Sequence, residues 1–156
     1  MKTITLIRHA HAEAGINKID LHRQLSARGK EEAKRQSEKM TLPDDAVLFI
    51  SPSTRTLETA AYWLKKQPNL RQKIVSDLYN ADLETLLNCI EEHAGENHLV
   101  VIAHNPGISE LYQYLTGLWT AFEPCTVALL QRETDTELIV KGNATILAYK
   151  TPGNNE

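Results

Sequence analysis

The stretch Thr3-Ile4-Thr5-Leu6-Ile7-Arg8-His9 decides how the rest of the chain is interpreted. Its β-branched and apolar residues predict a buried parallel strand over residues 2–8, and a cation and an imidazole stand at the end of that strand. The same arrangement returns where the apolar run 99–103 meets His104. Ligands of open α/β sheets bind outside the carboxyl ends of the parallel strands. We therefore expect Arg8, His9 and His104 to share one pocket.

A third apolar run, residues 46–50, adds Arg55 to this edge of the predicted sheet. The run is followed by Ser51-Pro52, and Arg55 then falls in the first turn of a predicted helix. A cation there opposes the helix dipole, so its presence is more easily explained if an anion binds alongside. His104 also directly precedes a predicted helix N-terminus, where free backbone N–H groups favour an anion.

These residues predict a phosphoryl-transfer site with His9 as the nucleophile. A neutral imidazole is a good nucleophile, and arginine pairs with phosphoryl oxygens through two parallel hydrogen bonds. Taken singly, Arg8-His9 could be an exposed strand-end pair, His104 a strand cap and Arg55 a surface cation. A metal site made by His9, His11 and His104 is a further alternative, but the arginines would repel a metal ion. We expect neither a metal nor another cofactor.

Length and composition favour one domain over residues 1–150, followed by a flexible tail over 151–156. The chain has 156 residues, 42% of them hydrophobic and 24% charged, which is typical of globular domains. Its net charge of -3 gives no support for nucleic-acid binding. The sequence contains no apolar stretch of about 20 residues and no signal-peptide pattern at its start, so we expect a cytoplasmic protein without a membrane segment.

Strand and helix patterns alternate along the chain, which predicts a three-layer α/β/α sandwich with a mostly parallel sheet. A loop is expected over 10–25 and a brief strand at 74–75. Near the C-terminus, segments 126–130, 137–140 and 145–149 read as antiparallel strands with a turn around Thr134-Asp135. Predicted helices begin near Ser26, Ser53 or Thr54, Asp82 and Asn105. The helix at Ser26 has a thin apolar face and is weakened by Gly29.

Four motifs in order resemble the histidine phosphatase superfamily and, within it, the small SixA-type phosphohistidine phosphatases. They are Leu6-Ile7-Arg8-His9-Ala10, the segment 23–29, the segment 51–59 and His104-Asn105-Pro106-Gly107. The resemblance covers about residues 2–115. It implies the phosphoglycerate-mutase-like fold, with a phosphorylated His9 assisted by Arg8, Arg55 and His104.

The resemblance also assigns Arg23 to the lining of the pocket, and we place Asn105 with it among the substrate-binding residues. The sequence departs from the family at Ala10, where most members have glycine. Larger members carry a glutamate proton donor in an inserted segment, and the corresponding region here, 77–82, is short. Asp77, Asp82 and Glu84 are candidates for that role by position only, and the reaction could also proceed without a dedicated acid.

We expect a metal-independent phosphatase whose preferred substrate is phosphohistidine on a protein and whose product is inorganic phosphate. A phosphoimidazole protonated on its second nitrogen leaves as neutral imidazole, so a strong general acid matters less. The short chain also leaves no long segment for a lid over a small ligand. The alternatives are a small-molecule phosphate-ester phosphatase, a phosphoglycerate-mutase-like transferase and a phosphate-binding module without turnover.

Overall fold

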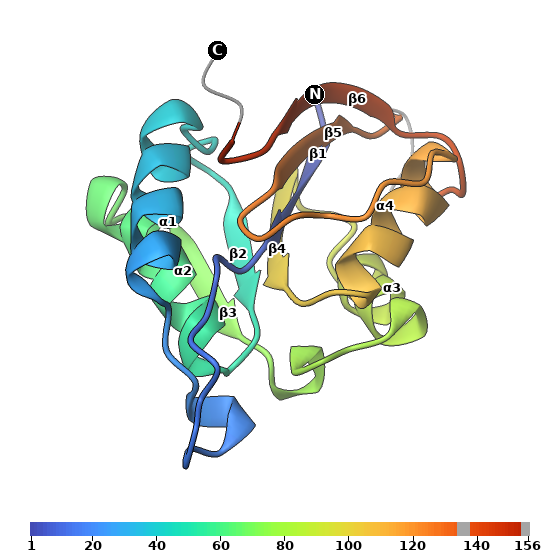
Figure 1. The fold of residues 1–156 in the computed structure, drawn as a ribbon. Coiled ribbons are helices and arrows are strands. Elements are labelled where there is room, and N and C mark those ends of the chain that lie inside the picture. Colours follow the sequence, from blue (N-terminus) through green and yellow to red (C-terminus); the bar gives the residue numbers. More distant parts are fainter. Residues whose placement is uncertain (134–137, 154–156) are drawn as a thin grey trace.

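A computed structural model of the chain describes residues 1–133 and 138–153. Six strands in the described residues form one sheet in the order β3-β2-β4-β1-β5-β6, with helices on both faces (Figure 1). The elements in chain order are β1 (Thr3–Arg8), η1 (Asp20–His22), α1 (Ala27–Lys39), β2 (Val47–Ile50), α2 (Thr54–Lys66), β3 (Arg71–Ile74), η2 (Ser76–Leu78), α3 (Leu83–Glu92), β4 (His98–Ala103), α4 (Gly107–Thr116), β5 (Val127–Gln131) and β6 (Thr145–Lys150). The predicted three-layer α/β/α fold is confirmed.

The first four strands run parallel, and β5 and β6 complete the sheet through antiparallel pairings. β1 pairs in parallel with β4 and antiparallel with β5, so it lies inside the sheet with neighbours on both sides. Ile4, Leu6 and Ile7 are fully buried, as expected for a strand that is covered by helices on both faces.

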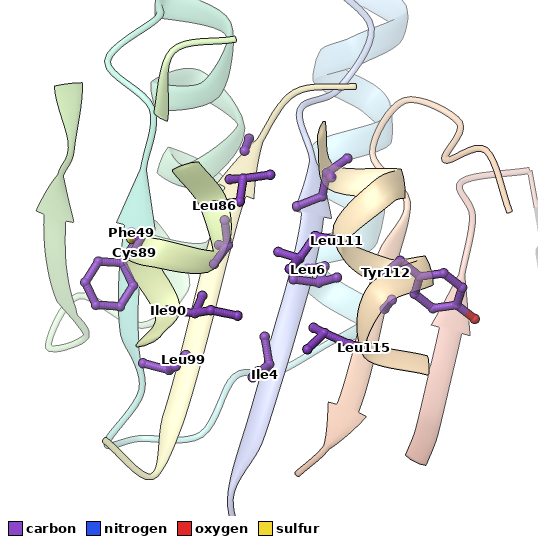
Figure 2. Packing of buried hydrophobic residues seen from close by; sticks show 14 of the residues in the cluster. Ile4, Leu6, Phe49, Leu86, Cys89, Ile90, Leu99, Leu111, Tyr112 and Leu115 are labelled. Carbon is purple, nitrogen blue, oxygen red and sulfur yellow. The ribbon is translucent and has the colours of Figure 1, made fainter. Parts of the chain in front are cut away.

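Alternate side chains of the central strands enter two separate cores. Ile4 and Leu6 pack with Leu99 and the helices α3 and α4 on one face, as Figure 2 shows. Ile7 points to the opposite face, where α1 and α2 contribute Ala33 and Trp63. Figure 1 shows these two helix pairs on opposite sides of the sheet. No helix in the described residues combines the length and the apolar character needed to span a membrane.

The chain leaves the neighbouring strands β1 and β4 in opposite directions. After β1 it passes through α1 to β2, beyond β4, whereas after β4 it passes through α4 to β5, beyond β1. The strand order therefore reverses between β1 and β4. The loop after β1 and the loop after β4 run in opposite directions from this point. Such a switch point is where open α/β sheets bind ligands, and here it carries His9 and His104.

Several predicted boundaries change. The brief strand expected at 74–75 is β3, residues 71–74, and residues 138–140 are not a strand. Residue 137 and the turn around Thr134-Asp135 lie outside the described residues, as do residues 154–156 of the predicted tail. The N-cap of α4 is Pro106, not Asn105, because Asn105 uses its side chain for other contacts described below.

Helix α1 depends on buried polar contacts more than on its apolar face. The Gln36 side chain donates hydrogen bonds to the carbonyls of Cys125 and Lys150, at 2.9 and 2.8 Å. Gly29 is buried against the loop after β1, where a Cβ atom would stand 1.9 Å from the His11 carbonyl oxygen. Gly29, which the sequence marks as a weak point of the helix, therefore also permits the close approach of that loop.

We predict that Gly29→Ala destabilises the protein, although helix propensity alone favours alanine by about 1 kcal/mol. The added methyl group must displace the backbone at His11, and overpacking of this kind costs about 1–3 kcal/mol. Urea unfolding at equilibrium measures the change. Gly153→Ala is the control, since nothing lies within 4 Å of its Cβ position. A Gly29→Ala protein more stable than the parent would contradict the prediction.

Candidate active site

His9 is fixed just beyond the end of β1 by its own backbone and ring. Its backbone N–H bonds to the Ala103 carbonyl on β4, and its Nδ1 lies 2.7 Å from the Ala10 carbonyl oxygen. A carbonyl can only accept, so Nδ1 carries the proton and the free lone pair of the ring is on Nε2. The Ala10 N–H in turn donates to Thr59 Oγ1 of α2 at 3.0 Å, which holds this turn against the neighbouring helix.

The environment of His9 keeps its imidazole neutral. The residue is 9% exposed, and burial lowers the pKa of His9 to about 3. The Ala10 carbonyl opposes this shift, whereas nearby His104, Arg55 and Arg8 reinforce it. The site therefore presents an uncharged nitrogen lone pair among positive charges, which is the state a nucleophilic histidine needs.

His104 lies beside His9 at the end of β4, with ring centroids 5.2 Å apart. Arg55 donates from Nη2 to Nδ1 of His104 at 3.4 Å, so Nε2 of His104 carries the proton and donates to Ser51 Oγ at 2.7 Å. Burial first, and the charge of Arg55 second, lower the pKa of His104 to about 4. His104 is thus a neutral ring oriented by residues from two other segments.

The side chain of Arg8 leaves β1 on the face opposite to that of Ile7. Its Nη1 donates to the Phe122 carbonyl at 2.7 Å, and its Nε is buried with no hydrogen-bond partner among the described residues. Burial lowers the pKa of the Arg8 guanidinium, yet arginine stays charged at neutral pH. Asn105 donates to the same carbonyl at 3.0 Å and accepts from Ser109, so it fixes the segment that orients Arg8.

Arg55 is buried in the first turn of α2, with its side chain only 4% exposed. Its Nη1 donates to the Asp20 carbonyl oxygen at 2.8 Å and its Nη2 to Asp20 Oδ2 at 3.1 Å. The anion expected beside Arg55 is thus present in this structure as an aspartate of η1. Arg23 also reaches Asp20, through Nη1 and Oδ1 at 3.0 Å.

Tyr79 contacts both Asp20 and His104. Its hydroxyl donates to Asp20 Oδ2, and its ring meets the His104 ring edge-on at 5.8 Å between centroids. The hydrogen bond from Tyr79 first, and that from Arg23 second, hold the pKa of Asp20 well below its usual range. The same bond raises the pKa of Tyr79. Asp20 is therefore an ionised carboxylate.

The structure brings His9, Arg8, Arg55 and His104 together, and Arg23 joins them through Asp20. The acid candidates lie elsewhere or have other partners. Asp82 caps α3 by accepting from the Thr85 N–H at 2.9 Å, and Glu84 is exposed in that helix's first turn. Asp77 lines a cleft of about 370 Å³ between β3 and α3.

Sequence reasoning missed three residues of the site: Ser51, Asp20 and Tyr79. Ser51 has a detectable signal, because it is the first residue after β2 at the edge where the other site residues stand. Asp20 and Tyr79 come from segments without periodicity, and only the fold places them beside Arg55. His11 bonds to Ser26 Oγ at 2.7 Å. In the described residues no group of three or more His, Cys, Asp or Glu side chains is arranged to hold a metal ion.

Residues 4–86 match the sequence profile of the histidine phosphatase superfamily (branch 1), and the chain belongs to this family. No curated protein sequence matches it significantly.

Solved structures with the same fold include several phosphatases. The chain is similar to a SixA phosphohistidine phosphatase of Agrobacterium tumefaciens, with a TM-score of 0.81, 21% identity and coverage of 97% of this chain and 98% of that one. It is also similar to a protein histidine phosphatase SixA complexed with tungstate, with a TM-score of 0.77, 18% identity and 99% coverage of both chains. A mycobacterial glucosyl-3-phosphoglycerate phosphatase has a TM-score of 0.71 and 12% identity, with coverage of 94% of this chain and 97% of that one. These likenesses establish the fold.

We predict that the imidazoles of His9 and His104 do not titrate between pH 8 and pH 5 in the free protein. Lowered pKa values of about 3 and 4 mean that the neutral forms persist as the pH falls through the ordinary histidine value near 6.5. Nitrogen-15 NMR of the rings measures this, with His9→Asn and His104→Asn variants for assignment. The urea-unfolded protein, in which both rings should titrate near 6.5, is the control. An inflection near 6.5 for either ring in the folded protein would refute the prediction.

Proposed function

We propose that the protein is a metal-independent phosphatase that acts through phosphorylated His9 and removes phosphate from phosphohistidine on a protein. One observation carries the proposal. The hydrogen bond from His9 Nδ1 to the Ala10 carbonyl leaves the lone pair on Nε2, beside two arginines and a second neutral histidine. Membership of the histidine phosphatase superfamily and the fold shared with SixA proteins support it.

In the first step, Nε2 of His9 forms a bond to phosphorus while the bond from phosphorus to the substrate's imidazole nitrogen breaks. The electron pair of that bond stays on the leaving nitrogen, and a proton on the second nitrogen makes the leaving group a neutral imidazole. Arg8 and Arg55 stabilise the charge of the equatorial oxygens, which is the main contribution a protein makes to phosphoryl transfer. His104 supports this role by accepting a hydrogen bond from Arg55 at its Nδ1. Arg23 and Asn105 complete the binding site, Asn105 by fixing the segment around Phe122.

In the second step, water attacks phosphorus and the bond to His9 breaks. The electron pair returns to Nε2, and phosphate leaves with the oxygen and both protons of the water. Neither step needs a divalent cation, because the guanidinium groups supply the positive charge that a metal ion supplies in other phosphatases.

The preference for phosphohistidine follows from the leaving group. An alkoxide needs a proton donor, whereas a protonated phosphoimidazole already leaves as a neutral molecule. Asp82, one candidate donor from the sequence, is already the cap of α3. The region that carries an inserted segment in larger family members is here η2 and a short link to α3, which is too short to fold over a small ligand as a lid.

We predict that His9→Ala abolishes hydrolysis and that EDTA leaves the rate of the parent protein unchanged. Loss of the nucleophile removes the covalent route, and mutagenesis of comparable nucleophiles lowers kcat by about 10⁶. Release of phosphate from a phosphohistidine-carrying phosphotransfer protein is the assay. His93→Asn, at the far end of α3, is the matched control and should retain activity. Activity lost on chelation and restored by a divalent metal would contradict the metal-free mechanism.

We also predict that kcat/KM for the phosphohistidine protein exceeds the values for fructose bisphosphate and for a serine phosphopeptide by about tenfold or more, a difference of about 1.4 kcal/mol in transition-state stabilisation. The comparison is made at one pH and one ionic strength. A value for either ester that equals the phosphohistidine value would assign the protein to the ester phosphatases instead. Phosphate binding without hydrolysis of any of the three substrates would identify a binding module.

A further inference from the structure

Asp20 occupies hydrogen-bonding positions that a phosphoryl group would use. Its carboxylate accepts from one terminal nitrogen of Arg55 and one of Arg23, and its backbone carbonyl accepts from the other terminal nitrogen of Arg55. A guanidinium N–H binds a carboxylate oxygen and a phosphate oxygen alike, so the two anions compete for these donors. The proposed function assigns both arginines to the phosphoryl group, and the present inference rests on that assignment.

The segment that carries Asp20 is held at its base rather than at its tip. The loop between β1 and α1 is closed by a bridge between Ala12 and Leu25, and the Leu25 N–H donates to Glu58 of α2 at 2.8 Å. Beyond this base, η1 extends past the carboxyl ends of the strands (Figure 1). Ile16 and Ile19 near its tip are 83% and 68% exposed. Little apolar packing therefore holds η1 in place.

The polar contacts of Asp20 hold it in the site. Its side chain is 45% exposed, so water can replace the protein at part of the carboxylate. The carboxylate binds Arg23, Arg55 and the hydroxyl of Tyr79. A bound phosphoryl dianion would take the two cations and repel the carboxylate beside it, since charges of like sign a few ångströms apart disfavour each other.

We propose that Asp20 is a further residue of the phosphate-binding site, an internal anion that free phosphate must displace from Arg55 and Arg23. A site with three arginines would otherwise retain inorganic phosphate, the product of the reaction. Asp20 lowers the affinity for every phosphoryl group, and a protein substrate offsets this loss through contacts outside the pocket. Free phosphate has no such contacts, so the loss leaves it weakly bound and allows it to leave the site. Tyr79 acts as a positioning residue, because its hydroxyl orients the carboxylate toward Arg55.

The test is the dissociation constant of inorganic phosphate, measured by titration calorimetry at fixed pH and ionic strength. Asp20→Asn keeps the size of the side chain and removes its charge, and we expect it to bind phosphate about fivefold more tightly than the parent. Asp44→Asn is the control, because it removes the same charge from an exposed position before β2, at the amino ends of the strands. Its dissociation constant for phosphate should stay within about twofold of the parent value. Unchanged or weaker binding by Asp20→Asn, as expected if Asp20 only holds Arg55 in position, overturns the proposal.

Tyr79→Phe provides a second measurement, and it is decisive if Asp20→Asn does not fold. It keeps the ring beside His104 and removes the hydroxyl that orients Asp20. We expect tighter phosphate binding than in the parent, by a smaller factor than for Asp20→Asn. Weaker or unchanged binding contradicts the proposal. Because phosphate binding needs no turnover, tighter binding in a protein that hydrolyses no substrate supports the role of Asp20 and refutes the proposed reaction. If neither the parent nor the variants bind phosphate, both ideas fail.

Discussion

The parallel pairing of β1 with β4 is the constraint on which the site depends. The backbone N–H of His9 bonds to Ala103, so the ladder of hydrogen bonds extends to the residues that carry the two histidines. Because the chain leaves β1 and β4 in opposite directions, their loops part and the two rings meet at 5.2 Å between centroids. Arg8 reaches the two rings from the end of β1, and Arg55 reaches them from the first turn of α2. A shift of one residue in this register would send His9 to the other face of the sheet.

Burial and charge act together in this pocket. Burial disfavours the protonated form of both imidazoles, and the neighbouring arginines disfavour it further, so the histidines stay neutral while the guanidinium groups stay charged. Hydrogen bonds then choose the tautomers, with the Ala10 carbonyl fixing His9 and Ser51 with Arg55 fixing His104. A lone pair is thereby available on His9 beside positive charge. Asp20 balances part of that charge when no phosphoryl group is present.

The central strands β1, β2 and β4 and the four central residues could be predicted because they depend on local patterns. Apolar runs that end in Arg8-His9 and in His104 place these side chains at one edge of a parallel sheet before any coordinate is known. The rest depends on contacts distant in sequence. Asp20 and Tyr79 are 59 residues apart and meet only in the fold, and Asn105 uses its amide to hold Phe122 rather than to cap α4. The packing role of Gly29 is hidden from the sequence for the same reason, since the carbonyl it accommodates belongs to the loop after β1.

The most direct test of the account is the chemical identity of the group that becomes phosphorylated during turnover. The protein is mixed briefly with a phosphohistidine-carrying phosphotransfer protein, quenched in alkali and examined by phosphorus NMR and peptide mapping. The account predicts one acid-labile phosphoryl group on Nε2 of His9, because Nδ1 is occupied by its hydrogen bond to Ala10. A phosphoryl group on Nδ1 of His9, on His104 or on a carboxylate would contradict it, as would turnover without any phosphorylated protein intermediate.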